Sequence, residues 1–124
     1  MTMGDTVLIV EDDENLRTVL ARSLRARQIE VVEAASAEDA AAALSSGLRP
    51  RLVLLDIHLP GASGWDFLRE AGLVAAGSPP VVITSASSVS PRRLTEARVA
   101  GYLPKPFALD AFLATVNRFV GAAR

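Results

Sequence analysis

Asp56 is the residue best placed to do chemistry, because it ends the apolar run of residues 52–56. Such a short, nearly continuous apolar run is typical of a strand buried on both faces of a parallel sheet. Pro60 and Gly61 force the chain to turn soon afterwards, so Asp56 is expected at the carboxyl end of this strand. Ligands bind at that end of the strands in an open α/β sheet. A carboxylate there costs free energy unless a partner offsets its charge.

Two further carboxylates are expected beside Asp56. The apolar, β-branched residues 6–10 predict another buried strand, and Glu11 and Asp12 follow it directly, whereas Asp13 leads into the next helix. Three like charges in one cleft repel one another, and burial raises the cost of ionising them. A hard divalent cation relieves this repulsion, and Mg²⁺ is typically held by carboxylates, waters and phosphate oxygens. The sequence therefore predicts a site for Mg²⁺, with Mn²⁺ as the alternative ion.

A hydroxyl and an ammonium group should reach the same cleft. Thr84 closes the apolar segment 81–84, and Lys105 follows the short segment 102–104. A metal ion, an ammonium and a hydroxyl could each bind one oxygen of a phosphoryl group. An aspartate can accept such a group as an acyl phosphate. The combination favours phosphoryl chemistry at Asp56.

The elements that position these residues alternate between strand and helix. Strands are expected at residues 6–10, 29–34, 52–56, 81–84 and 102–104, and helices at 15–27, 37–46, 64–73, 91–100 and 109–120. This alternation implies parallel strands joined by right-handed crossovers. We predict an α/β fold with a doubly wound five-stranded parallel sheet of order 2-1-3-4-5, whose switch point between the first and third strands brings Glu11, Asp12 and Asp56 into one cleft.

Composition limits the class of protein. The 124 residues are enough for a single domain (1–124), half of them are hydrophobic and 22% are charged, as in an ordinary soluble globular protein. The absence of cysteine excludes disulfides, thiolate metal sites and cysteine nucleophiles. A net charge of −1 gives no electrostatic reason to expect nucleic acid or an anionic membrane as partner. The sequence contains no apolar run long enough to span a membrane and no secretion signal, which favours the cytoplasm.

Four motifs at four strand ends resemble the receiver domain of two-component response regulators. They are VLIVEDDENLR (7–17), LVLLDIHLPGASGWDFL (52–68), VVITSAS (81–87) and YLPKPF (102–107), and their order and separations fit the family over essentially the whole chain. The resemblance implies a flavodoxin-like, CheY-like three-layer sandwich. It also implies a signalling switch that catalyses only its own phosphorylation and dephosphorylation, rather than a metabolic enzyme.

The resemblance assigns a role to each residue of the predicted cleft. Asp56 would be the phosphoacceptor, supplied by a sensor histidine kinase or a phosphotransfer protein. Glu11, Asp12, Asp56 and the backbone carbonyl of His58 would hold the metal. Thr84 and Lys105 would sense the phosphoryl group.

Four further positions follow from the same resemblance. Tyr102 would swing inward when Thr84 moves, and the Lys105–Pro106 peptide would be cis. His58 and Ala86 would tune the lifetime of the acyl phosphate by shaping the access of water. The output face would be formed by the helix at 91–100, the strand at 102–104 and the helix at 109–120, which is also the usual site of phosphorylation-driven homodimers. The segment that leads into Tyr102 is slightly shorter than the family's, so the helix at 91–100 should start late, shift register or be partly unravelled.

Two other functions fit the residues less well. A phosphate-independent pseudo-receiver, acting only by docking, is disfavoured because the Asp, Thr and Lys set is complete. An aspartate-nucleophile phosphatase of the haloacid-dehalogenase type needs a second acid where this chain has His58. We expect no output domain in this chain. Whether it is a stand-alone receiver that docks on a downstream protein, or a piece of a DNA-binding regulator or hybrid kinase, stays open at this point.

Overall fold

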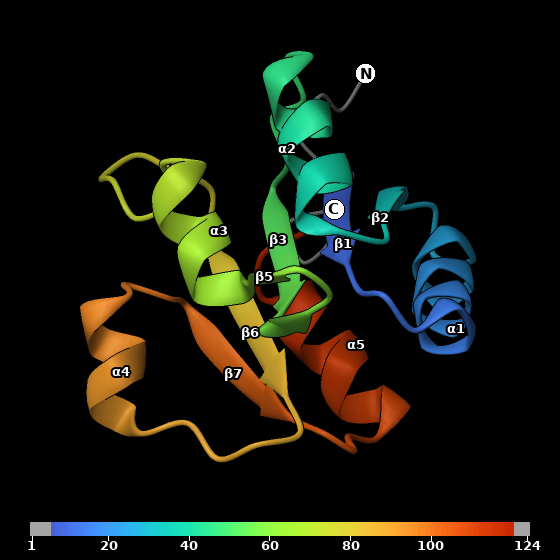
Figure 1. Ribbon diagram of the computed structural model, residues 1–124. Helices are drawn as coiled ribbons and strands as arrows, with labels where there is room; N and C mark the ends of the chain where they lie inside the picture. The colour runs from blue at the N-terminus through green and yellow to red at the C-terminus, as the bar shows by residue number, and fades with distance from the viewer. Residues whose placement is uncertain (1–5, 121–124) are drawn as a thin grey trace.

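A five-stranded parallel sheet lies between two layers of helices (Figure 1). The computed structural model describes residues 6–120. Its elements are β1 (Thr6–Val10), α1 (Glu14–Arg25), β2 (Glu30–Ala34), α2 (Ala37–Ser45), β3 (Leu52–Asp56), β4 (His58–Leu59), β5 (Ala62–Ser63), α3 (Gly64–Glu70), β6 (Val81–Ser85), α4 (Pro91–Glu96), β7 (Gly101–Pro104) and α5 (Leu109–Asn117).

The order of the sheet is β2-β1-β3-β6-β7, and each neighbouring pair is parallel. Since β6 and β7 are the fourth and fifth strands of this sheet, the predicted order 2-1-3-4-5 is confirmed. The chain reverses its direction of winding at β1, which has β2 on one side and β3 on the other. The predicted doubly wound α/β fold is therefore present, with its switch point between β1 and β3.

Alternate residues of each central strand belong to two separate cores. Val7 and Ile9 of β1 pack with α1 and α5, including the fully buried Phe112. Leu8 and Val10 pack on the other face with residues of α2 and α3. Because side chains alternate between the faces of a strand, a strand covered on both faces needs apolar residues at every position. This explains why the central strands read as continuous apolar runs.

Most differences from the predicted elements lie at their ends. β6 continues one residue past Thr84 to Ser85, and β7 begins one residue early, at Gly101. The first, third and fifth helices are shorter than the predicted ranges 15–27, 64–73 and 109–120. Two residues counted in the apolar stripes of α1 and α5 are not in the core, since Val19 is 51% and Leu109 42% exposed. Apolar spacing thus located the helices but overestimated their buried faces.

Helix α4 is short at its carboxyl end. It begins at Pro91, as predicted, with the Ser90 hydroxyl accepting a hydrogen bond from the Arg93 N–H at 3.1 Å. It ends after six residues, and Arg98 then takes a left-handed backbone conformation with φ of 58°. Of the three outcomes expected for the shortened segment, partial unravelling is the one observed. No residue of α4 is buried.

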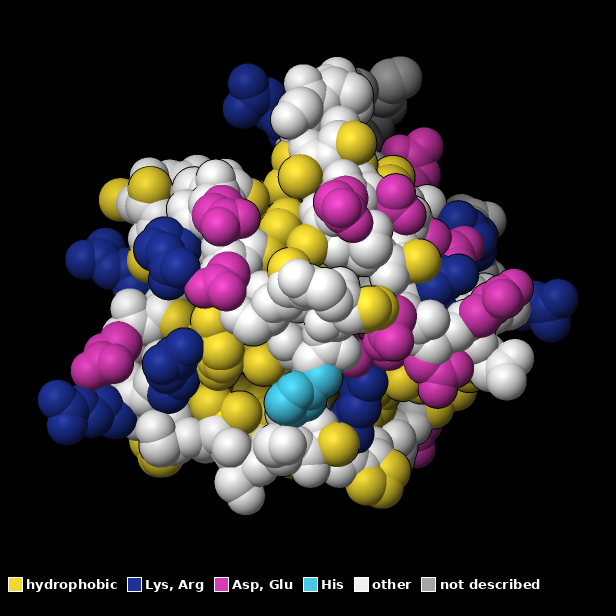
Figure 2. Space-filling model, viewed as in Figure 1, with side chains coloured by type: hydrophobic (Ala, Val, Ile, Leu, Met, Phe, Trp, Pro, Cys, Tyr) yellow, Lys and Arg dark blue, Asp and Glu magenta, His cyan; other side chains and the backbone are white. Residues whose placement is uncertain are grey.

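Helices α3 and α4 meet through partly buried side chains, among them an arginine stacked on an aromatic ring. The Arg93 guanidinium lies 4.5 Å from the centre of the Trp65 ring, and Trp65 is only partly buried against the second core. Hydrophobic side chains are visible in the gap between α3 and α4, with Lys and Arg side chains beside them (Figure 2). A cavity of about 470 Å³ occupies this gap, lined by Trp65, Leu68 and Ala97 among others.

A small antiparallel ladder follows β3 and was not predicted. His58 pairs with Ser63 and Leu59 with Ala62, so the turn at Pro60 and Gly61 closes a hairpin. The hairpin returns the chain to the end of β3, where the Gly64 N–H donates to the Ile57 carbonyl at 2.8 Å. Helix α3 can therefore begin directly against the strand that carries Asp56.

No helix among residues 6–120 is both long enough and apolar enough to cross a membrane.

The close approach at Gly64 predicts a stability effect. A Cβ at this position would lie 2.8 Å from the Ile57 Cα and 2.9 Å from the Asp56 carbonyl oxygen, both backbone atoms. We expect Gly64→Ala to lower the free energy of unfolding by about 1–3 kcal/mol, measured by urea denaturation. Gly101→Ala is the matched control, because its Cβ would meet only the Val82 side chain, at 3.4 Å. Equal stability of the Gly64→Ala variant and the wild type would contradict this account.

Candidate functional site

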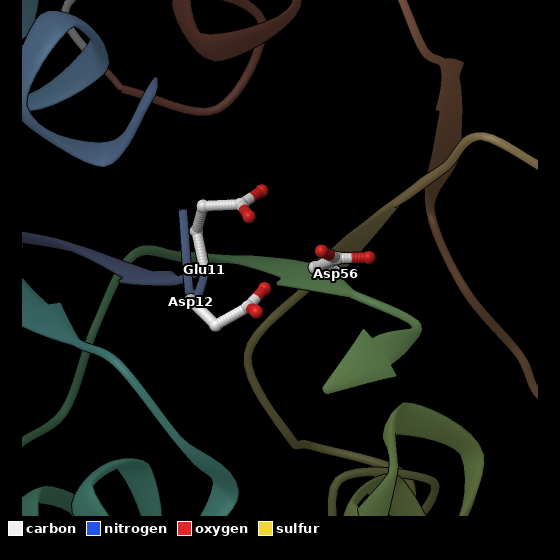
Figure 3. Close-up of side chains that lie close together, drawn as sticks. All are labelled: Glu11, Asp12 and Asp56. Atoms are coloured by element: carbon white, nitrogen blue, oxygen red, sulfur yellow. The ribbon is translucent and has the colours of Figure 1, made fainter. Parts of the chain in front are cut away.

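Three carboxylates converge at the carboxyl edge of the sheet. Val10 pairs with Leu55, so Glu11 and Asp12 leave β1 beside the end of β3, where Asp56 lies. Side-chain oxygens of Glu11, Asp12 and Asp56 all lie within 4.8 Å of one another. Figure 3 shows the three carboxylates facing a common space. The parallel strands thus bring together the acidic side chains that the sequence placed at their ends.

Two of these carboxylates are almost completely buried. Glu11 is 3% and Asp56 4% exposed, whereas Asp12 is exposed to solvent. Each of the two buried carboxylates accepts a hydrogen bond from the backbone N–H of the residue two positions later in the chain. The His58 N–H donates to Asp56 Oδ1 at 2.9 Å, and the Asp13 N–H donates to Glu11 Oε2 at 3.1 Å. These contacts fix the direction of both carboxylates but do not neutralise their charge.

Lys105 supplies the opposite charge. Its ammonium lies 2.8 Å from Glu11 Oε1 and 3.0 Å from Asp56 Oδ2, so it bridges the two buried carboxylates. Strand β7 positions this lysine, since the Lys105 N–H donates to the Ser85 carbonyl at 2.8 Å. The Lys105–Pro106 peptide is cis, as predicted.

Burial and charge act in opposite directions on these groups. Burial raises the pKa of the Glu11 carboxyl above its ordinary value of 4.5, and the charge of Asp56 adds to the rise; hydrogen bonds from Lys105 and from the Asp13 N–H oppose it. For Lys105, burial lowers the pKa, but its hydrogen bonds to Glu11 and Asp56 outweigh burial and raise the pKa above 10.5. Burial therefore disfavours the ionised form of Glu11, whereas Lys105 stays charged.

The other residues predicted for the site lie on β4, β6, β7 and the loop that follows β6. Thr84 pairs with Asp56 in the ladder between β3 and β6, and only 2% of it is exposed. Tyr102 is partly buried, and its hydroxyl donates to the Ser87 carbonyl at 3.2 Å, in the loop between β6 and α4. The side chains of His58 and Ala86 are exposed. The metal-ligand role of the His58 carbonyl stays a prediction.

The donor set fits a hard divalent cation. Three carboxylates against one ammonium leave two negative charges in excess, and all the side-chain donors are oxygens. Oxygen-only sites with carboxylates suit Mg²⁺ and Mn²⁺ rather than the softer transition metals. Glu11, Asp12 and Asp56 could therefore hold Mg²⁺.

Two residues that hold the site were missed in the sequence. The Arg17 guanidinium donates to the Glu11 carbonyl at 2.8 Å, and the Ser85 carbonyl accepts the Lys105 N–H. One signal for Arg17 was present: a positive side chain in the first turn of a helix opposes the helix dipole and calls for a compensating contact. No local signal distinguished Ser85.

Comparison with known proteins adds the family. Residues 7–117 match the model of the response regulator receiver domain. The response regulator MprA of Mycolicibacterium vanbaalenii is 36% identical over 112 residues, which are 90% of this chain and 48% of that protein. The chain thus spans about half the length of the curated relatives it matches.

Two solved structures show the same architecture. The receiver domain of the hybrid histidine kinase CckA is 32% identical, with a TM-score of 0.75 over 94% of this chain and 99% of that one. The response regulator TrrA of Thermotoga maritima, in complex with Mg²⁺-BeF, is 27% identical, with a TM-score of 0.79 over 94% of this chain and 99% of that one.

The raised pKa of Glu11 predicts how stability depends on pH. Because the folded-state pKa lies above the unfolded value, the folded state binds this proton more tightly, and the stabilisation is lost as pH rises through the folded pKa. Without divalent cations, the free energy of unfolding of the wild type relative to Glu11→Gln should therefore fall as pH is raised from below 4.5 towards neutrality. Urea denaturation across this range measures the difference. A difference that stays constant or grows with pH would contradict the argument.

Proposed function

The chain belongs to the receiver domain family of two-component response regulators, and we propose that Asp56 accepts a phosphoryl group from a sensor histidine kinase or a phosphotransfer protein. The observation that carries this proposal is the convergence on Asp56 of two further carboxylates and the Lys105 ammonium. The family is a family of signalling switches, so the proposed reactions serve to set a state. We place the protein in the cytoplasm with its phosphodonor as part of this proposal.

The proposed transfer is a substitution at phosphorus. A carboxylate oxygen of Asp56 forms the new O–P bond while the P–N bond to the donor imidazole breaks and the imidazole leaves. The Asp56 carboxylate is held by the His58 N–H on one oxygen and by Lys105 on the other. The Lys105 ammonium can then neutralise charge that builds up on the phosphoryl oxygens. Slow attack by water on the acyl phosphate releases inorganic phosphate and restores the carboxylate.

Magnesium is the proposed cofactor. Glu11, Asp12, Asp56 and the His58 carbonyl would hold Mg²⁺, which would neutralise phosphoryl oxygens and draw the donor to the cleft. The burial of Glu11 and Asp56 beside the exposed Asp12 supports this assignment, since it leaves an excess of negative charge open to solvent on one side. The Mg²⁺-BeF complex of TrrA supports the same choice of ion.

The proposed output is a change in the face formed by α4, β7 and α5. No residue of helix α4 is fully buried, and only its Leu94 is partly buried, against the second core. Segments with few buried contacts are those that shift most easily. Tyr102 of β7 contacts the loop that joins Thr84 to α4, through its hydrogen bond to the Ser87 carbonyl. Movement of Thr84 towards a phosphoryl group would shift the population of conformations of this loop and of α4. The face would then meet a downstream protein, an output domain or a second copy.

Neither alternative function gains support. A docking module that works without phosphate would not need two buried carboxylates that share one partly buried lysine, which costs desolvation free energy. An aspartate-nucleophile phosphatase of the haloacid-dehalogenase type would need an acid at position 58, where the structure has an exposed histidine.

Replacing the acceptor tests the proposal directly. Asp56→Asn should abolish covalent labelling by acetyl phosphate and Mg²⁺, detected as a mass increase of one phosphoryl group on the intact protein. Chelation of Mg²⁺ by EDTA should abolish labelling of the wild type as well. Asp66→Asn is the matched control, because Asp66 is an exposed aspartate of α3 paired with Arg69, and this variant should still be labelled. Labelling of the Asp56→Asn variant would overturn the proposal.

His58 offers a test of how water is excluded. Its side chain is exposed, while its backbone N–H, which alanine would keep, donates to Asp56. We expect His58→Ala to hydrolyse its acyl phosphate several-fold faster, since water reaches the phosphoryl group more easily, and to bind Mg²⁺ as the wild type does. The decay of the phosphorylated mass after removal of the donor gives the rate, and calorimetry gives the affinity. Decay at the wild-type rate would count against the proposed role.

A further inference from the structure

Glu11 and Asp12 are neighbours in sequence, yet both reach the same site. Consecutive residues of a strand point to opposite faces, so an extended chain would direct only one of them towards Asp56. Figure 3 shows both carboxylates on the side of Asp56. The ladders of β1 with β2 and with β3 both end at Val10. Beyond Val10, β2 still accepts the Glu11 N–H, but the Glu11 carbonyl on the Asp12 side needs a donor from outside the sheet.

The contact that holds this peptide comes from Arg17. Past the end of a ladder, a backbone carbonyl needs another hydrogen-bond donor. The Arg17 guanidinium donates to the Glu11 carbonyl through Nη1 at 2.8 Å, while the Glu11 N–H still donates to the Ala34 carbonyl at 3.0 Å. Only 15% of the Arg17 side chain is exposed, which is low for an arginine.

Glu33 in turn orients Arg17. Arg17 Nε lies 3.2 Å from Glu33 Oε1, and the other oxygen of the same carboxylate lies 3.0 Å from Arg25 Nη1. The planar guanidinium of Arg17 thus uses two of its nitrogens in fixed directions, one towards strand β2 and one towards the Glu11 carbonyl. A lysine could not reproduce this fork. Because Arg17 lies in the first turn of α1, where the helix dipole disfavours a cation, its position is explained by these contacts.

We propose that Arg17, oriented by Glu33, is a positioning residue that fixes the Glu11–Asp12 peptide so that both carboxylates face the Mg²⁺ site. This inference rests on the proposed function, because it assumes that the site binds Mg²⁺. Groups that orient metal ligands commonly change affinity by about 10–100-fold when they are replaced.

Mg²⁺ affinity of the full chain, measured by calorimetry, tests the proposal. We expect Arg17→Met to weaken Mg²⁺ binding by about 10-fold or more. Arg25→Met is the matched control, because Arg25 contacts the same carboxylate of Glu33 but not the Glu11 carbonyl, and it should bind Mg²⁺ as the wild type does. Glu33→Gln should give a smaller loss, since it removes only the support of Arg17. Urea denaturation of each variant separates affinity from stability.

A second readout needs no metal. The Asp13 N–H donates to Glu11 Oε2, so its hydrogen exchange reports how firmly the loop is held. Without Mg²⁺, exchange at Asp13 should be faster in Arg17→Met than in either Arg25→Met or the wild type. Where Arg17→Met does not fold, Arg17→Lys replaces it, and this variant should also lose Mg²⁺ affinity because it lacks the fork.

The outcomes separate this inference from the function on which it rests. If the wild type binds Mg²⁺ and the Arg17 variants bind it equally well, or if Arg25→Met loses as much affinity, Arg17 does not position the site and the proposed function stands. If the wild type itself binds no Mg²⁺, the proposed function fails and the inference fails with it.

Discussion

The burial of two carboxylates, Glu11 and Asp56, at the ends of adjacent strands is the constraint on which the rest of this structure depends. Like charges at this distance repel, and their removal from water costs free energy that the hydrophobic cores must offset. The single ammonium of Lys105 pairs with both carboxylates, although Lys105 lies 94 residues from Glu11 and 49 residues from Asp56 along the chain. The remaining negative charge is what makes the site a place for a cation and, in the proposed function, for a phosphoryl group.

The fold meets this constraint by holding each charged group on a rigid element. β1, β3 and β7 carry Glu11, Asp56 and Lys105 to the same edge of the sheet, and both faces of the central strands are covered by helices. The hairpin after β3 then returns the chain so that α3 begins at Gly64, against the strand end. Charged groups at fixed positions need little rearrangement when a ligand arrives, which is the basis of electrostatic preorganisation.

The periphery of the site is less firmly built than its centre. Helix α4 has six residues, none of them fully buried, and it contacts the rest of the domain through the stacking of Arg93 on Trp65 and through the partly buried Leu94. This contrast suits the proposed function, in which Asp56 would stay rigid while the surface that reports its state would have two arrangements of similar free energy. The chain spans about half the length of the curated relatives it matches. A downstream protein or output domain that binds this surface is therefore part of the proposed function.

The sequence by itself determined the five strands of the main sheet, their order and the acidic cluster with Lys105 beside it, but not the β4–β5 hairpin. These follow from local signals, since apolar runs locate buried strands and a carboxylate at a strand end must lie at one edge of a parallel sheet. Only the tertiary structure decided where α4 ends, that Val19 and Leu109 lie at the surface, and that Arg17 contacts the Glu11 carbonyl. Spacing shows which residues share a side of a helix, but only the packed neighbours decide how much of that side is covered and which backbone groups need a donor.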